Sequence, residues 1–348
     1  MRFEGAWTAL VTPMTADGEA DWAGLEKNIE FQAVQGITGL VPAGTTGESP
    51  SLNWGEHNRA IETALRLAKA RLSVIAGTGS NSTAETLAST EHAVEHGAEA
   101  VLLVDCYYNG PSSLELREQY HGVIAREFPG VSVIPYVIPG RTGTALLPED
   151  LVILANECPN VCAVKEATGD LERMARTRRL VGKSFSIMSG DDDITLRMMS
   201  DPAIAANGVI SVISNVTPAA VEEMTRKALA GDMAGAAKLQ DALAPLFGIV
   251  TVKVDNVRTM PDGSRVTVND RFRNPSAIKT LMAALGMPSG PCRRPLGKMT
   301  KSGVDAVRAA AKQVWDENPE ILAPVGCFYR VDLDVRLGDD SIWDALSC

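Results

Sequence analysis

Short apolar runs alternate with longer amphipathic stretches over the first two thirds of the chain. Several of these runs are apolar throughout, rather than alternating between apolar and polar residues, which is typical of parallel strands covered by helices. Eight such runs are predicted to be strands, at residues 7–12, 39–44, 73–79, 100–106, 132–139, 161–167, 185–191 and 208–212.

The stretches between the runs carry apolar residues at helical spacing. In the first stretch Trp22, Leu25, Ile29 and Ala33 follow the i, i+3, i+4 pattern, and Gly36 is placed to end the helix. Strands and helices that alternate eight times predict an α/β protein with a (β/α)8 TIM barrel. An open, doubly wound sheet is the alternative, but it usually carries a glycine-rich dinucleotide loop that is incomplete here.

After about residue 230 the pattern changes to helices, predicted at residues 233–247, 275–285 and 303–315. Two alternating runs on either side of Asp262-Gly263 predict a β-hairpin between the first two of these helices. We therefore expect a barrel over residues 1–230, a C-terminal helical domain over 231–316 with the hairpin inserted at about 251–274, and a loosely organised tail over 317–348.

Composition narrows the class of protein. The 348 residues are 45% hydrophobic and carry a formal net charge of -10, which suits a globular enzyme and argues against a nucleic-acid surface. No apolar stretch approaches the roughly 18 residues of a membrane span, and residues 1–5 lack the apolar core of a signal peptide. The six cysteines show no CxxC pair, so we expect no disulfide scaffold and a cytoplasmic protein.

Lys165 is the most informative polar residue, because it interrupts the apolar run at residues 161–167. Lysine is rarely buried, since an ammonium group leaves water only at high cost. One interpretation is an edge position whose ammonium reaches solvent. The other is an amine kept neutral by burial, which can attack a ketone and form a Schiff base.

Active sites of barrels gather at the carboxyl ends of the strands, and three further features fall there. The turn Gly44-Thr45-Thr46-Gly47-Glu48 could direct N–H groups and hydroxyls at a carboxylate, or could be an ordinary turn with a threonine cap. Tyr136 could exchange protons with a bound substrate, or be a buried aromatic residue. Arg141 offers a planar fork for a carboxylate, or a surface ion pair.

A metal site is not expected from the sequence. The run Asp191-Asp192-Asp193 has consecutive side chains that point in different directions and no accompanying histidine, so a solvated loop is favoured. All histidines, at His57, His92, His96 and His121, fall in predicted helices and need no ligand role.

Five motifs, taken in this order, resemble those of the dihydrodipicolinate synthase family, within the pyruvate-dependent class I aldolase group that includes N-acetylneuraminate lyase. They are Gly44-Thr45-Thr46-Gly47-Glu48-Ser49, Tyr107-Tyr108-Asn109, Tyr136 with Pro139 and Arg141-Thr142-Gly143, Lys165-Glu166-Ala167-Thr168-Gly169, and Ser189-Gly190-Asp191-Asp192. The similarity covers about residues 3–245 and resumes from 274 to about 311.

The resemblance implies a lyase that condenses pyruvate with L-aspartate 4-semialdehyde to give 4-hydroxy-tetrahydrodipicolinate, a step towards diaminopimelate and lysine. It implies a (β/α)8 barrel with a helical C-terminal domain and a homotetramer built as a dimer of dimers. It implies no metal or organic cofactor, because pyruvate is held as a covalent Schiff base.

The resemblance also assigns roles to individual residues. Lys165 would form the Schiff base and Tyr136 would donate and accept protons, with the rest of the hydroxyl relay at Thr45 and Tyr108, the latter reaching in from a neighbouring subunit. The substrate-binding positions would be Thr46, Ile210, Gly190 and Arg141, the last of which receives the carboxylate of the semialdehyde. In members inhibited by lysine, the inhibitor site at the dimer interface matches Ser49, His57, Asn81, Glu85 and Tyr107.

This chemistry sets two electrostatic expectations: burial should keep Lys165 neutral, and the pKa of Tyr136 should be lowered towards the working pH. The chain departs from the family pattern at Val137, which is commonly Asn, and at Gly110, which is usually Arg. Three alternatives stay open: an aldolase of the same group with a different aldehyde, a non-catalytic binder of pyruvate or lysine, and a barrel that holds pyridoxal phosphate on Lys165.

Overall fold

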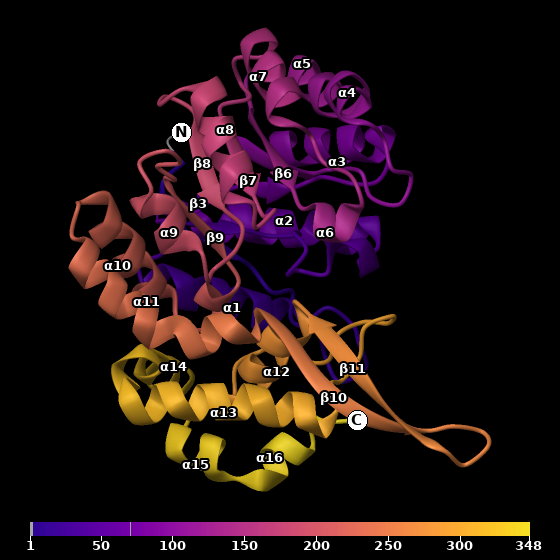
Figure 1. Cartoon of the computed structure of the whole chain (residues 1–348), viewed down its shortest axis with the longest axis vertical. Coiled ribbons are helices and arrows are strands. Elements are labelled where there is room, and N and C mark those ends of the chain that lie inside the picture. Colours follow the sequence, from indigo (N-terminus) through magenta and orange to yellow (C-terminus); the bar gives the residue numbers. More distant parts are fainter. Residues whose placement is uncertain (1–2, 70) are drawn as a thin grey trace.

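The computed structural model describes residues 3–69 and 71–348. Figure 1 shows a barrel of strands wrapped by helices, with a layer of C-terminal helices on one side of it and a long two-stranded hairpin projecting from that layer. Within the described residues, no helix has both the length and the apolar character that crossing a membrane requires.

The parallel strands of the barrel form one sheet, in the order β3-β2-β1-β9-β8-β7-β6-β5-β4. The two edge strands, β3 and β4, are separated in the chain only by Ile75, so the edges of the sheet meet and the barrel closes. Both lie within the single strand predicted at residues 73–79, and the predicted (β/α)8 barrel is confirmed. The strands are β1 (Gly5–Ala9), β2 (Gly39–Val41), β3 (Ser73–Val74), β4 (Ala76–Gly77), β5 (Ala100–Val104), β6 (Ser132–Val137), β7 (Ala163–Glu166), β8 (Ser186–Ser189) and β9 (Gly208–Ser211).

Helices follow the strands and cover the outside of the barrel, as the i, i+3, i+4 pattern predicts. The sequence sets where they begin: at the start of α2, the Asn53 side chain accepts a hydrogen bond from the N–H of Glu56, and the Glu56 carboxylate accepts one from the N–H of Asn53. These helices are α1 (Trp22–Val34), α2 (Trp54–Ala68), α3 (Thr83–Glu95), α4 (Ser113–Glu115), α5 (Gly122–Glu127), α6 (Pro139–Thr142), α7 (Pro148–Glu157), α8 (Leu171–Val181), α9 (Thr195–Ser200) and α10 (Pro218–Leu229).

Strand alternation divides the core into two parts. Successive side chains of a strand point to opposite faces, so Ile134 and Tyr136 of β6 pack inside the barrel, whereas Val133 and Val137 pack against the outer helices. The same alternation on β7 places Lys165 on the inner face. Two neighbouring strands therefore direct a phenol and an amine into the barrel.

The C-terminal region is helical apart from the hairpin. The predicted hairpin is confirmed: β10 (Thr251–Thr259) pairs antiparallel with β11 (Arg265–Arg273), and its base packs on α13 while its tip projects from the body (Figure 1). The helices here are α11 (Met233–Phe247), α12 (Ser276–Ala284), α13 (Lys301–Glu317), α14 (Ala323–Tyr329), α15 (Leu333–Gly338) and α16 (Asp340–Asp344).

The expectation of a loosely organised tail is wrong. Its aspartates suggested loops, but Asp332 and Asp339 are helix caps that accept hydrogen bonds from the N–H groups of residues 335 and 341. Trp343 is buried, and the Tyr329 hydroxyl donates to Asn28 of helix α1 at 2.8 Å. The tail therefore packs as ordered helices against the rest of the protein.

A buried ion pair joins the C-terminal helices to the turn at residues 44–49. The Lys279 ammonium on α12 donates to the Glu48 carboxylate at 2.5 Å, and each side chain is only 1% exposed. The same ammonium donates to the carbonyls of Thr12 and Pro291, and the second oxygen of Glu48 accepts from the N–H of Arg293. All this hydrogen bonding compensates for the removal of both charges from water.

Replacing Lys279 with alanine should destabilise the fold strongly, because it leaves the Glu48 charge buried without its partner. We expect a loss of about 3–5 kcal/mol in the free energy of unfolding, measured by urea denaturation. Lys301→Ala is the matched control, since the Lys301 side chain is 63% exposed in its ion pairs with Asp305 and Asp344 and should cost at most about 1 kcal/mol. Equal losses in the two variants would show that burial of the Lys279 pair is unimportant.

Candidate active site

A pocket of about 300 Å³ lies at the carboxyl ends of the barrel strands, where a barrel enzyme holds its substrate. Its lining combines the turn after β2, the ends of β4, β5 and β6, and the segment after β6. The lining residues are Ala43, Gly44, Thr45, Ser49, Pro50, Gly77, Gly79, Leu102, Val104, Tyr107, Tyr136, Arg141 and Thr142.

Lys165 lies beside this pocket, inside the barrel. Its side chain is 6% exposed, so the interpretation as an edge lysine with a solvated head is wrong. Burial lowers the pKa of Lys165 to about 8; the nearby carboxylates of Asp191 and Asp192 oppose this shift, and Arg141 adds to it. The amine is therefore neutral in a useful fraction of molecules close to neutral pH, as the Schiff-base interpretation requires.

Tyr136 is the immediate neighbour of the amine. The two residues are paired in register between β6 and β7, and the Lys165 ammonium nitrogen lies 4.2 Å from the centre of the Tyr136 ring. Burial raises the pKa of Tyr136 to about 12, although Arg141 and a hydrogen bond with Thr45 act in the opposite direction. The expectation of a lowered pKa is wrong, because excluding water from the phenol disfavours the phenolate more than its neighbours stabilise it.

The turn at residues 44–49 contributes both threonines to this region. Thr45 lines the pocket and hydrogen-bonds to Tyr136. Thr46 is buried, and its hydroxyl accepts a hydrogen bond from the Asn274 side-chain amide at 2.9 Å. The turn is held in place by the buried pair of Glu48 and Lys279 described above.

Asn274 positions residues of the candidate site, although the sequence analysis did not single it out. Its backbone carbonyl accepts a hydrogen bond from the Arg141 guanidinium at 2.8 Å, and its side chain reaches Thr46. It therefore fixes two proposed substrate-binding residues from outside the barrel. The only signal in the sequence was that the family resemblance resumes at this residue after the hairpin.

Two apolar positions shape the space around the amine. A Cβ atom on Gly190 would lie 2.6 Å from the Ala167 Cβ and 3.1 Å from the Lys165 Cε, so a larger residue would displace the lysine side chain. Ile210 is buried among the inward-facing residues of the barrel, as its proposed place in a pyruvate site requires.

The acidic run forms a loop, as predicted, but the prediction that it is solvated is wrong for Asp192. Asp192 is buried, and its carboxylate accepts hydrogen bonds from the Ser211 hydroxyl and from the N–H of Val212 at 2.9 Å. Burial raises the pKa of Asp191 and that of Asp192 to about 6. Only Asp193 is exposed. Asp192 thus braces the end of β9, and its carboxylate acts together with that of Asp191 on the charge of Lys165.

Tyr108 is not brought to the site within this chain. Its side chain is 94% exposed and its backbone has a φ of 74°, in the left-handed region. The remaining residues of the proposed relay, Thr45 and Tyr136, are together.

Of the residues of the proposed inhibitor site, Tyr107 and Ser49 lie at the pocket, whereas His57 is buried on α2. Tyr107 lines the pocket and hydrogen-bonds to the backbone of Asn81, while its pKa is raised by burial and by the charge of Glu85. Ser49 lines the same pocket. His57 is buried on α2 and stacks edge-on against Trp54, and burial lowers its pKa to about 4.

A (β/α)8 barrel with a pocket at the carboxyl ends of its strands defines the chain as a barrel enzyme. The model of the Dihydrodipicolinate synthetase family matches residues 2–314. The chain belongs to this family. A 4-hydroxy-tetrahydrodipicolinate synthase from Methanothrix thermoacetophila is 37% identical over 315 residues, which cover 90% of this chain and 98% of the relative.

Solved structures agree with the family assignment. The chloride-inhibited dihydrodipicolinate synthase from Acinetobacter baumannii, complexed with pyruvate, has a TM-score of 0.79 and 34% identity over 89% of this chain and 98% of its own. The enzyme from Cyanidioschyzon merolae with lysine bound has a TM-score of 0.79 and 33% identity over 90% of this chain and 98% of its own.

The rate at which the Lys165 amine reacts should rise with pH and level off above about pH 8, because only the neutral form is nucleophilic. The Asp191 carboxylate stabilises the ammonium form, so Asp191→Asn should lower the pKa of Lys165 and move this profile to lower pH. Asp193→Asn removes a neighbouring but exposed charge and should move it less. The measurement is the rate of Schiff-base formation with pyruvate against pH; a shift to higher pH in Asp191→Asn would contradict this account.

Proposed function

We propose that this chain is a 4-hydroxy-tetrahydrodipicolinate synthase, a lyase that condenses pyruvate with L-aspartate 4-semialdehyde through a Schiff base on Lys165. The observation that carries the proposal is the pair of Lys165 and Tyr136: a buried amine with a pKa of about 8, 4.2 Å from the ring of a buried phenol. The family membership and the names of the relatives support the same reaction.

The first stage joins pyruvate to the enzyme. The neutral amine of Lys165 attacks C2 of pyruvate, and a C–N bond forms while the ketone oxygen becomes a hydroxyl group. Because the pKa of Tyr136 is about 12, its phenol carries a proton that it can donate to this hydroxyl, which then leaves as water. The products are an iminium ion on Lys165 and a phenolate on Tyr136.

The second stage makes the new C–C bond. The positive iminium favours the adjacent phenolate electrostatically, and the phenolate removes a proton from the pyruvate methyl group to give an enamine. The enamine carbon attacks the aldehyde carbon, and the Tyr136 phenol protonates the aldehyde oxygen. The neutral amino group of the semialdehyde then attacks the iminium carbon and closes the six-membered ring. The bond between that carbon and the Lys165 nitrogen breaks and leaves a ring imine, and the proton lost from the attacking amino group returns to the Tyr136 phenolate. No organic cofactor or metal takes part in this scheme, because the iminium is the electron sink.

The carboxylates of the two substrates would be bound by different groups. In the proposal, the turn with Thr45 and Thr46 receives the pyruvate carboxylate through its N–H groups, over the apolar surface of Ile210 and beside Gly190. Arg141 receives the carboxylate of the semialdehyde, in the bidentate manner that guanidinium favours. Its link to Asn274 supports this role, since it holds the guanidinium at the pocket.

The exposed position of Tyr108 fits a proposal in which the enzyme is a homotetramer built as a dimer of dimers. An aromatic side chain that is 94% exposed is suited to contact another subunit, where it would complete the relay of Thr45 and Tyr136. A lysine-binding site formed by Ser49, His57, Asn81, Glu85 and Tyr107 would lie at the same interface.

Borohydride should reduce the Schiff base and leave one pyruvate-derived group on Lys165, detected by mass spectrometry of proteolytic peptides. Lys165→Met should lose this adduct and all turnover, because it keeps the apolar volume but removes the amine. Lys301→Ala serves as the control, since it removes an exposed lysine and should be trapped normally. An adduct on another lysine in the wild-type protein would refute the assignment of Lys165.

Tyr136→Phe should reduce turnover on the order of 10²-fold or more, because each proton transfer then lacks its donor and acceptor. Tyr329→Phe makes the same chemical change at another buried tyrosine, in α14, and should keep most of the activity. The readout is a coupled assay with pyruvate and L-aspartate 4-semialdehyde. Retention of full activity in Tyr136→Phe would remove this residue from the mechanism.

A further inference from the structure

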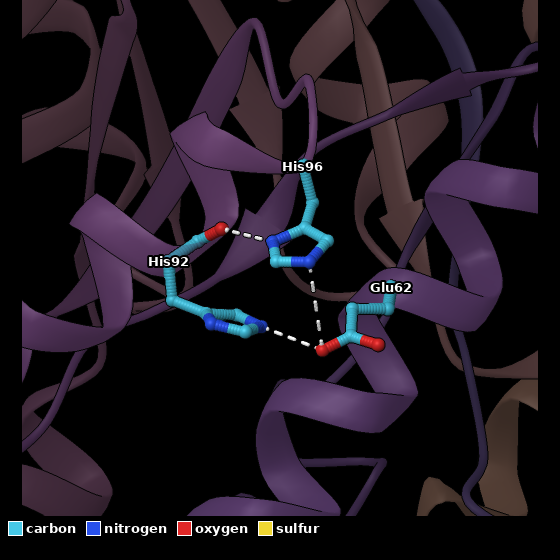
Figure 2. Close-up of side chains that lie close together, drawn as sticks. All are labelled: Glu62, His92 and His96. Carbon is cyan, nitrogen blue, oxygen red and sulfur yellow. Dashed lines mark hydrogen bonds and ion pairs between the residues drawn. The ribbon is translucent and has the colours of Figure 1, made fainter.

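Three side chains of the types that bind transition metals meet on the outside of the barrel. Glu62 comes from α2, His92 from α3, and His96 is the residue that caps the end of α3 (Figure 2). One ligand atom from each lies within 4.8 Å of the others. From the sequence we expected no ligand role for these histidines, because they fall in a predicted helix. Their i, i+4 spacing places both on one helix face, where Glu62 of the neighbouring helix meets them.

The present distances are close to those that a bound ion would need. The Glu62 Oε1 lies 2.8 Å from the His92 Nε2 and 3.9 Å from the His96 Nε2. A tetrahedral zinc ion with ligands at about 2.0–2.1 Å separates its ligand atoms by about 3.3–3.4 Å. The two distances to Glu62 therefore differ from the tetrahedral spacing by roughly 0.5 Å, and the ligand atoms of the two imidazoles lie within 4.8 Å of each other.

The hydrogen bonding of His96 prepares it for a metal. Its Nδ1 lies 2.7 Å from the backbone carbonyl of His92, and a carbonyl can only accept, so this nitrogen carries the proton. In the neutral ring the lone pair is then on Nε2, which faces the Glu62 carboxylate (Figure 2). Two acceptors that face each other call for a cation between them, and a histidine that donates its other N–H to a carbonyl is the usual arrangement in metal sites.

Two of the three lysine and arginine side chains that line the neighbouring cleft, those of Arg59 and Arg66 but not that of Lys69, are engaged with other groups. A cleft of about 390 Å³ beside the cluster is lined by Arg59 and Arg66 as well as by Glu62 and His96. Arg66 is paired with the carboxylate of Glu26 at 2.5 Å, and the Arg59 guanidinium stacks 4.3 Å above the ring of Trp22. The cleft leaves room for the water that would be the fourth ligand of the ion.

We propose that Glu62, His92 and His96 bind one divalent transition-metal ion of the zinc class, which imidazole and carboxylate ligands favour. The ion would replace the proton shared by His92 and Glu62 and tie α2 to α3. Since α3 leads into β5 at His96, the site lies at the amino-terminal face of the barrel, opposite the pocket, where barrels hold stabilising features. Its role is therefore to stabilise the outer helices.

The test is a calorimetric titration of the full chain with ZnCl2, after treatment with a chelator and removal of any purification tag. The exposed thiols of Cys327 and Cys348 would also bind zinc, so both are changed to serine in every protein compared. We expect saturable binding of one ion per chain and a higher unfolding temperature in its presence, since the ion binds only the folded arrangement.

His96→Ala and Glu62→Gln should each weaken zinc binding by at least about tenfold. The control is Glu95→Gln, which removes an equal charge beside His96 from an exposed position on α3 and should leave binding unchanged; circular dichroism verifies that each variant is folded. Absence of saturable binding, or equal binding by Glu62→Gln and Glu95→Gln, would overturn the proposal. Neither result depends on the Schiff-base chemistry of Lys165.

Discussion

The chemistry proposed for this protein requires that water be excluded from the amine of Lys165. Lys165 faces the interior because strand alternation on β7 leaves it no other direction, and burial then lowers its pKa to about 8. Its neighbours set how far the shift goes, since the carboxylates of Asp191 and Asp192 favour the charged form and Arg141 disfavours it. The absence of a side chain at Gly190 leaves room for the lysine. A barrel interior is well suited to this purpose, because its closed ring of strands shields the inner side chains from water.

In the mechanism that we propose, the same exclusion of water sets the order of the proton transfers. A tyrosine with a lowered pKa would begin as a base, whereas Tyr136, with a pKa of about 12, begins as an acid. It becomes a base only after the iminium has formed beside it, when the new positive charge stabilises the phenolate. The charge that makes the methyl protons of pyruvate acidic thus also makes the base that removes them. Burial of the pair is useful for both steps, because a low dielectric strengthens the attraction between the two charges.

The architecture was largely predictable from local patterns, and the exceptions share a cause. The strands, the barrel and the hairpin follow from periodicity and turn residues within short segments, and the register that places Tyr136 beside Lys165 follows from neighbouring strands. Contacts between distant segments were not predictable: Asn274 with Thr46, Lys279 with Glu48, and Glu62 with His92. The polar composition of a segment also led to wrong predictions of exposed loops. Asp192 is buried with hydrogen-bond donors, and the aspartates of the tail cap helices. An aspartate in a loop and an aspartate that caps a helix have the same local sequence signal.

A crystal structure of the protein soaked with pyruvate would show whether Lys165 forms the Schiff base. We expect continuous electron density from the Lys165 side-chain nitrogen to C2 of pyruvate, with the Tyr136 hydroxyl within hydrogen-bonding distance of the bound group. Pyruvate bound without a covalent bond to Lys165, or bound away from the interior of the barrel, would contradict it.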